Sequence, residues 1–323
     1  MEHQDGGELC FPQHLNASCR KPKISQSKTV LLYFLFYFIF SGFSVALNLL
    51  VIISAAAHTH QSPILSLAVS DFLFGFMTLL ESYKQTTCWF LGDLICSLYV
   101  YVNSIILGAS VGNMILISVD RYVAIRDPLH YPIRATVTRV KMCVCMCWTC
   151  SVVYNGLIFK DFLDQPGQYR SCYGKCVGGT DNISGMIDNV LSSLAPVTVI
   201  IILYIRVFVT AVAQARAMRS HVLTATHQPS GAVTTKKSEL KAARTLGVAV
   251  VVFLLCFCPY FSCAFVPADS VGHLYDIGYF LLQISPCLNP VIYALFYPWF
   301  RKALRLIFSL QILQPGSRET NMM

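Results

Sequence analysis

Charged residues are scarce in this 323-residue chain. Asp, Glu, Lys and Arg make up 12% of it, whereas soluble proteins carry about 25%. Hydrophobic residues account for 55% of the sequence. A water-exposed surface of this size cannot be covered with so few charges, so composition disfavours a soluble domain and favours a membrane protein.

Other absences narrow the class further. We find no inverted repeat and no continuous polar pathway, so a transporter or channel is the disfavoured alternative. The loops lack a nucleophile–base pair, and we expect no enzyme activity and no cofactor. The last apolar run, 277–297, contains no Lys that could hold retinal. Residues 1–28 are polar and the first apolar run is long, so we expect no cleavable signal peptide.

Seven apolar runs have the length of membrane-spanning helices, about 18–27 residues. They lie at 29–54, 64–83, 95–119, 142–159, 186–212, 245–265 and 277–297. The sequence therefore predicts an all-α membrane fold, a seven-transmembrane helix bundle followed by a short amphipathic eighth helix on the cytoplasmic side. The predicted parts are an N-terminal tail at 1–28, the bundle at 29–297, and the amphipathic helix with the cytoplasmic tail at 298–323.

Basic residues concentrate on one side of the predicted bundle. Sixteen of the 24 Lys and Arg residues lie there: Arg121, Arg126, Arg134, Arg139, Lys141, Arg206, Arg216, Arg219, Lys236, Lys237, Lys241, Arg244, Arg301, Lys302, Arg305 and Arg318. The positive-inside rule makes this side, with the C-terminus, cytoplasmic and the N-terminus extracellular. We predict a multi-pass plasma-membrane protein in contact with lipid. Its net charge of +8 needs no nucleic-acid partner.

Two sequons are candidate glycosylation sites, and a cysteine-rich run has the composition of a metal site. Asn16-Ala17-Ser18 and Asn182-Ile183-Ser184 match the glycosylation pattern, although the second lies close to a helix start. CVCMCWTC at 143–150 lies inside an apolar helix and lacks His partners. We interpret its cysteines as buried packing residues and expect no metal site.

The outer side carries cysteines that can pair. Cys19, Cys96, Cys172 and Cys176 lie in outer loops or at helix ends, where an oxidising compartment favours disulfides. Cys10 and Cys88 also lie on this side, so the residues alone leave the connectivity open.

Ionisable residues within the apolar runs are few, and such residues are usually functional. Asp71 lies mid-helix, Asp120 and Arg121 at the inner end of the third helix, and Glu239 before the sixth. Glu81 and Asp188 lie in the outer parts of the second and fifth helices. No Lys or Arg lies in the outer half of the predicted spans, so we expect Glu81 and Asp188 to have no basic partner within the protein.

Seven motifs, in order, resemble those of the rhodopsin-like G-protein-coupled receptors. They are Asn48; Asp71 in LAVSD; Cys96 with Asp120-Arg121-Tyr122; Trp148; Pro196 with Tyr204; Phe257-Cys258-Pro259; and Asn289-Pro290 with Tyr293. Within that class, NPVIYALFYPWFRKAL (289–304), SVDRYVAIRDPLHYP (118–132) and ELKAARTLGVAV (239–250) resemble the trace-amine-associated receptors. DRYVAI and PLHYP also occur in odorant receptors, so an odorant-type receptor for neutral ligands is the alternative.

The resemblance implies a receptor for extracellular amines that acts through a heterotrimeric G protein of the stimulatory or olfactory type and raises cAMP. It implies disulfides Cys96–Cys176 and Cys19–Cys172, with Cys10 as the alternative partner. The implied activation switch comprises Asp120, Arg121, Tyr122, Tyr204, Glu239, Asn289, Pro290 and Tyr293. Asp71, Ser110 and Asn289 resemble an allosteric sodium pocket. Two departures are Ser285-Pro286, where the family has Asn-Ser, and Phe257, where amine receptors have Trp.

The ligand anchor also departs from the amine-receptor pattern. Eighteen residues before Arg121, where amine receptors carry Asp, this chain has Asn103, and Gln283 replaces a helix-seven Tyr. Asp188 lies eight residues before Pro196, about 12 Å toward the outside, and Ser192 shares its face. This resembles the receptors whose anchoring acid lies on helix five.

We therefore predict an amine- or diamine-binding site. Its predicted residues are Asp188, Asn103, Ser192, Phe257, Tyr260, Phe261, Gln283 and Glu81. Alternatives stay open: Asp188 as a solvated loop acid, Glu81 at the aqueous mouth, Asn103 as a helix–helix contact, and the aromatic residues as packing.

Overall fold

A computed structural model describes residues 8–14, 17–20, 28–56, 62–127, 130–180, 182–224, 231–262, 268–296 and 298–309. For residues 28–33, 56, 132, 182, 214–224, 231–246, 268–273, 275–276, 296, 298–299, 306 and 308, it describes the backbone alone.

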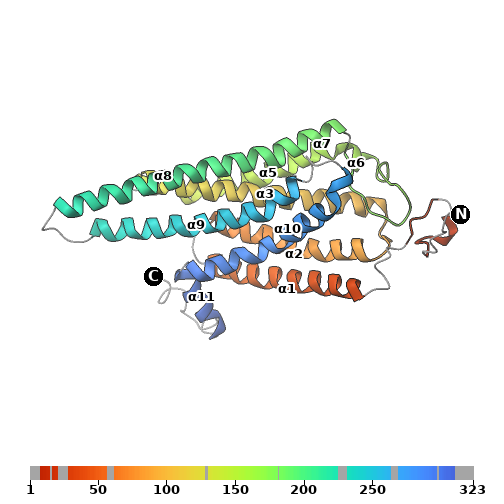
Figure 1. Cartoon of the computed structure of the whole chain (residues 1–323), viewed down its shortest axis with the longest axis horizontal. Coiled ribbons are helices and arrows are strands. Elements are labelled where there is room, and N and C mark those ends of the chain that lie inside the picture. The colour runs from red at the N-terminus through yellow and green to blue at the C-terminus, as the bar shows by residue number, and fades with distance from the viewer. Residues whose placement is uncertain are drawn as a thin grey trace.

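Long helices run side by side along one axis, with the two termini at opposite ends (Figure 1). They are α1 (Lys28–Ala56), α2 (Ser62–Thr86), α3 (Gly92–Arg126), α5 (Val137–Ile158), α8 (Ala195–Thr224), α9 (Gly231–Ser262) and α10 (Ala268–Phe296). α7 (Asn182–Asp188) and the π-helical turn η4 (Asn189–Leu194) continue into α8. The predicted all-α, seven-helix bundle is confirmed, and most of its helices extend beyond the predicted apolar runs.

The apolar faces of these helices point outward, as lipid requires. Within the part of the chain that the structure describes, six helices are long and apolar enough to cross a membrane, and the apolar part of α9, Gly247–Ser262, is shorter. Leu157 is 71% exposed and Phe38 is 58% exposed, whereas Asn48 is fully buried. The prediction of buried packing cysteines is wrong for Cys145 and Cys150, which are exposed; Cys150 lies on the cavity side of α5.

Polar contacts join the helices inside the bundle. The Asn48 side chain donates to the carbonyl oxygens of Ser44 (2.9 Å) and Pro286 (3.0 Å). The Trp148 indole donates to the Ser66 hydroxyl at 2.9 Å. α10 stays helical through both of its prolines. These contacts satisfy donors that lipid could not, whereas the Asn48 Oδ1 atom is buried without a hydrogen-bond partner among the described residues.

At the N-terminal end, three disulfides cover the bundle: Cys10–Cys88, Cys19–Cys172 and Cys96–Cys176. The last two are the predicted pairs, and Cys10–Cys88 was not predicted. Backbone bonds from Cys19 to Tyr173 (2.8 Å) and from Tyr173 to Ala17 (2.7 Å) add to them. The described part of the tail is therefore a structured cover. Of the two sequons, Asn16 lies outside the described residues and Asn182 is the first residue of α7, with its side chain undescribed.

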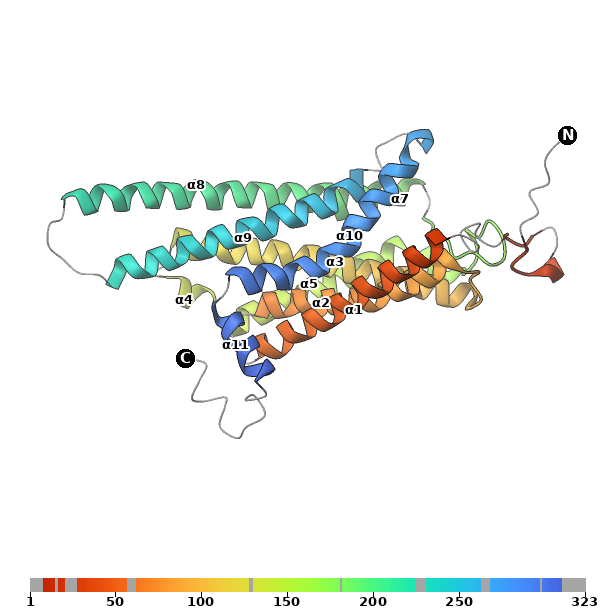
Figure 2. The same ribbon diagram turned by 60° about the horizontal axis from the view of Figure 1, so that its bottom comes forward.

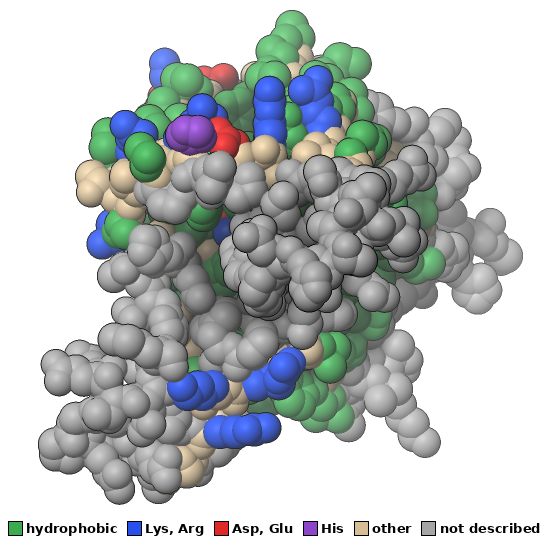
Figure 3. All heavy atoms as spheres, turned by 90° about the vertical axis from the view of Figure 1, so that its left-hand side faces the viewer, with side chains coloured by type: hydrophobic (Ala, Val, Ile, Leu, Met, Phe, Trp, Pro, Cys, Tyr) green, Lys and Arg blue, Asp and Glu red, His purple; other side chains and the backbone are tan. Residues whose placement is uncertain are grey.

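The opposite end is rich in Lys and Arg (Figure 3). Exposed basic residues there include Arg126, Arg134, Arg139, Lys141, Arg301, Lys302 and Arg305. Short helices α4 (Tyr131–Arg134) and α11 (Pro298–Phe308) also lie at this end (Figure 2). In α11, Phe300 and Ala303 are buried against the bundle. Its placement along the membrane surface stays a prediction.

Candidate functional site

A cavity of about 1080 Å³ lies within the bundle, and its lining extends from Glu81, Lys84 and Thr180 near the disulfide-covered end to Leu116 and Cys143 toward the basic end. Side chains from α2, α3, α5, α7, η4, α8, α9 and α10 line it. Six of the eight residues predicted to bind amine are among them: Glu81, Asn103, Asp188, Ser192, Tyr260 and Phe261. The fold thus gathers residues that lie far apart in the sequence around one space large enough for a small molecule.

The last residue of α7, Asp188, presents a half-buried carboxylate to this cavity. The Tyr154 hydroxyl on α5 donates to its Oδ1 atom at 3.0 Å. The Ser192 hydroxyl donates instead to the Asp188 backbone carbonyl, at 2.6 Å. Asp188 is therefore held by a neutral donor and retains acceptor capacity for a ligand. Asp188 belongs to a helix, which disfavours the alternative of a solvated loop acid.

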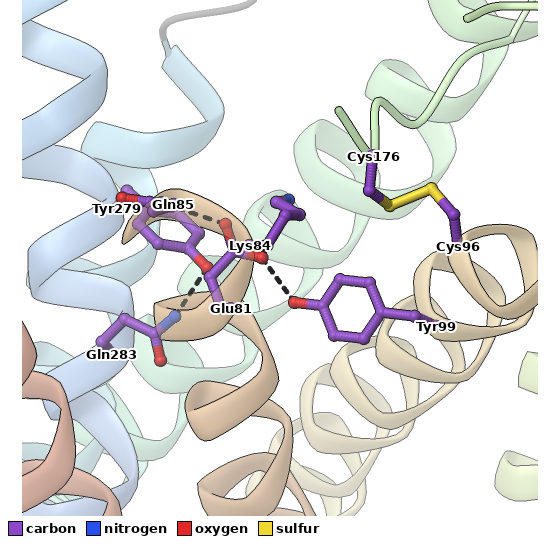
Figure 4. Close-up of polar contacts among 8 residues, drawn as sticks. All are labelled: Glu81, Lys84, Gln85, Cys96, Tyr99, Cys176, Tyr279 and Gln283. Carbon is purple, nitrogen blue, oxygen red and sulfur yellow. Dashed lines mark hydrogen bonds and ion pairs between the residues drawn. A yellow bond between two sulfur atoms is a disulfide. The ribbon is translucent and has the colours of Figure 1, made fainter. Parts of the chain in front are cut away.

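The second acid of the cavity, Glu81 on α2, is 5% exposed and differently surrounded (Figure 4). Its carboxylate accepts hydrogen bonds from Tyr99 (2.5 Å) and Gln85 (3.0 Å). The Lys84 ammonium lies 2.8 Å from it. The expectation that Glu81 has no basic partner is therefore wrong. The predicted span ended at residue 83, but α2 continues to Thr86, and Lys84 lies one turn from Glu81.

Two predicted ligand residues do not line the cavity. Gln283 is buried, accepts a hydrogen bond from Thr78 (2.7 Å) and donates one to the Tyr279 hydroxyl (2.7 Å). Phe257 is buried in the core and stacks on Phe253 with ring centroids 4.0 Å apart. The structure thus favours the packing alternative for Phe257, whereas Tyr260 and Phe261 border the cavity.

Known proteins resemble this chain over almost its whole length. The family described as 7 transmembrane receptor (rhodopsin family) matches residues 47–293. Trace amine-associated receptor 8a of Rattus norvegicus is 36% identical, covering 96% of this chain and 95% of that protein. Trace amine-associated receptor 7e of Mus musculus is 35% identical over 98% of this chain and 92% of its own length. Trace amine-associated receptor 6 of Pan troglodytes is 33% identical over 98% of this chain and 95% of its own length.

The chain belongs to the trace amine-associated receptor family. It is thus a multi-pass membrane receptor of the rhodopsin type, and not an enzyme. Membership implies a small-molecule ligand and a heterotrimeric G protein as partners.

At the basic end of this receptor, Arg121 is engaged by its own helix and by α4. Its guanidinium pairs with Asp120, with an Nε–Oδ2 distance of 2.9 Å. The Tyr131 hydroxyl donates to Asp120 at 2.8 Å and accepts from Arg121 at 3.3 Å. Burial raises the pKa of Tyr131 to about 12, so this hydroxyl keeps its proton at neutral pH. Glu239, the other predicted partner, lies in α9 and its side chain is outside the described residues.

The other predicted switch residues are distributed along the half of the bundle nearer the basic end. Tyr122 accepts a hydrogen bond from Arg126 at 3.0 Å. The Tyr204 ring packs directly against Gly247 of α9, a place where a Cβ atom would collide with the hydroxyl. Tyr293 is buried and lies edge-on to Phe300. Pro290 lies inside α10 next to Asn289.

The predicted sodium-pocket residues lie around a much smaller space. The Asn289 side chain donates to Asp71 at 2.8 Å, and Ser110 donates to the carbonyl of Ile106 at 3.1 Å. The cavity that Asp71, Ser110 and Asn289 line has a volume of about 10 Å³. Because a single water needs about 10–15 Å³, this arrangement does not fit a hydrated cation, and the sodium site stays a prediction.

Sequence reasoning missed Tyr154 and Lys84. Lys84 could have been found, because it follows Glu81 by three residues in one helix. Tyr154 carried no such signal, since it lies 34 residues from Asp188 in the sequence.

Proposed function

We propose that this receptor is activated by an extracellular protonated amine and signals through a stimulatory heterotrimeric G protein to raise cAMP. The proposal depends above all on Asp188, an acid that lines the cavity and accepts a hydrogen bond there from the neutral Tyr154 hydroxyl. The basic residues at the opposite end support a cytoplasmic face there and an extracellular N-terminus in the plasma membrane.

The surroundings of the cavity suit an amine with an apolar portion. Asn103 offers hydrogen bonds without charge, so the net attraction for a cation comes from the helix-five side. Tyr260 and Phe261 lie edge-to-face, with ring centroids 5.2 Å apart. Such rings can contact the apolar part of a ligand or a cation through the π-face.

Activation follows as a ligand-driven shift between two populations. A ligand that bridges Asp188 and the α9 aromatic residues favours the arrangement in which the inner end of α9 has moved. That movement opens the surface next to Arg121 for the G protein. The ligand can shift the equilibrium between the two arrangements only by the difference in its affinity for them.

A cAMP reporter in receptor-expressing cells tests this proposal with primary amines and their neutral isosteres, in which a methyl or hydroxyl replaces the amino group. We expect a dose-dependent response to at least one amine and none to its isostere, compared with cells that lack the receptor. Equal potency of amine and isostere would instead support the odorant-type alternative.

A further inference from the structure

One ammonium group of the protein itself, that of Lys84, already lies in the lining of the cavity, paired with the Glu81 carboxylate. The Lys84 Nζ atom lies 2.8 Å from the Glu81 carboxylate and 5.5 Å from the centroid of the Tyr99 ring. A carboxylate beside an aromatic face is the chemistry that recognises an organic ammonium group. Figure 4 shows Glu81 between Tyr99 and the side chains of α10, with Lys84 on the same turn of α2.

This site is rigidly built. Glu81 is 5% exposed and Tyr99 is 6% exposed. Hydrogen bonds from Tyr99 and Gln85 hold both oxygens of the carboxylate. The 24% exposure of the Lys84 side chain identifies it as the more accessible member of the ion pair. Removing Lys84 would therefore leave a formed anionic site that opens into the cavity.

The charged residues that line the cavity determine how many ammonium groups of a ligand can find a negatively charged partner there. Among the described residues that line it, the Asp, Glu, Lys and Arg residues are Glu81, Lys84 and Asp188. Glu81 and Lys84 neutralise each other, which leaves one negative charge at Asp188. A second ligand ammonium would have to displace Lys84 and leave that lysine without its counter-ion inside the cavity.

We infer that Lys84 determines ligand specificity by filling the second ammonium site, so that the receptor accepts ligands with one ammonium group and discriminates against diamines. This inference rests on the proposed amine function. Asp188 binds the ammonium, and Lys84 acts through Glu81 to exclude a second one.

The test compares straight-chain 1-aminoalkanes with α,ω-diaminoalkanes of the same length, from three to eight carbons, in the cAMP assay. In the parent receptor we expect the monoamine to be more potent at every active length. Lys84→Met should raise the diamine-to-monoamine potency ratio by about tenfold or more at one or more lengths, since an unpaired carboxylate gains a ligand partner. Lys84→Gln gives the same test if Lys84→Met does not reach the cell surface.

Two controls isolate the charge. Lys84→Arg keeps a cation that can pair with the Glu81 carboxylate and should keep the ratio within about threefold of the parent. Adding Glu81→Gln to Lys84→Met should abolish the gain. The inference would be overturned if the parent receptor preferred diamines. It would also be overturned if the diamine-to-monoamine potency ratio stayed unchanged in Lys84→Met and Lys84→Gln at verified surface expression. Either result would leave the proposed amine function standing. If no amine acts on the parent or on any variant, the proposed function fails and the inference fails with it.

Discussion

At the residue scale, the two cavity acids differ in their partners. Asp188 accepts a hydrogen bond from the neutral Tyr154, whereas Glu81 has the cationic Lys84 beside it. At Asp188 a ligand cation gains a carboxylate that has no cationic partner in the cavity lining, whereas at Glu81 it must compete with the Lys84 ammonium. This difference is the reason that we propose Asp188, the less buried of the two, as the anchor.

Tyr154→Phe tests the support of Asp188. The variant removes a hydrogen bond to a carboxylate, a contact worth about 1.5–3 kcal/mol, but keeps the anchoring charge. We expect amine potency to fall by about tenfold, less than after loss of the Asp188 charge. The measurement is an amine dose–response at matched surface expression. An unchanged potency would contradict a role for Tyr154 in holding the anchor.

Whether a site residue could be predicted depended on how far along the chain it lies from the residues that it contacts. Asp188 could be placed on a cavity-facing helix because Pro196 gives the register of helix five. Lys84 was recoverable from its spacing to Glu81, but the predicted helix ended one residue too early. The pairing of Tyr154 with Asp188 depends on how α5 packs against α7, which no local pattern encodes.

At the element scale, the seven helices were predictable because apolar runs of membrane length have few alternative structures. The ends of the helices were not predictable, because segments such as 120–126 of α3, which contains charged residues, continue the helix beyond the apolar run. The π-helical η4 between Asp188 and Pro196 was also unforeseen. The N-terminal cover depends on Cys10–Cys88, a pair that the residues alone left open.

The Cys10–Cys88 disulfide is expected to stabilise the cover rather than the bundle. It joins residues 78 apart, while Cys19–Cys172 independently holds the tail to the outer loop. We expect Cys10→Ser with Cys88→Ser to reach the surface, with a lower Tm and faster proteolysis around residues 8–14. A thermal melt with limited proteolysis measures both. Resistance equal to the parent would contradict this role, and Cys145→Ser, at an unpaired cysteine exposed on α5, is the matched control.

At the scale of the whole molecule, α3 contributes both to the lining of the cavity and to the Arg121 region at the basic end of the bundle. Signalling requires that occupancy at one end changes the contacts at the other. Asp120 and Tyr131 hold Arg121 to α3 and α4, and the Tyr204–Gly247 contact joins α8 to α9. Of these, the Tyr204–Gly247 contact is the one that a shift of α9 would alter directly.

Tyr131→Phe tests the inner end. It removes the hydroxyl that donates to Asp120 and accepts from Arg121. We expect basal cAMP to rise by roughly threefold, which corresponds to a shift of about 0.7 kcal/mol in the equilibrium between the resting and active states. Glu239→Ala should act in the same direction, because it removes the opposite charge that the sequence predicts near Arg121. Basal cAMP at equal surface expression is the measurement. Unchanged values in both variants would argue against a lock at Arg121.

The central claim is that the amine anchor lies on helix five at Asp188 and not on helix three at Asn103. The most direct measurement is an amine dose–response on Asp188→Asn, which keeps the shape of the side chain and removes its charge, with Asp188→Glu as the charge-retaining control. Loss of one partner of a buried ion pair costs about 3–5 kcal/mol, so we predict a potency loss of roughly two to three and a half orders of magnitude. Potency within a few-fold of the parent, at verified surface expression, would contradict the claim.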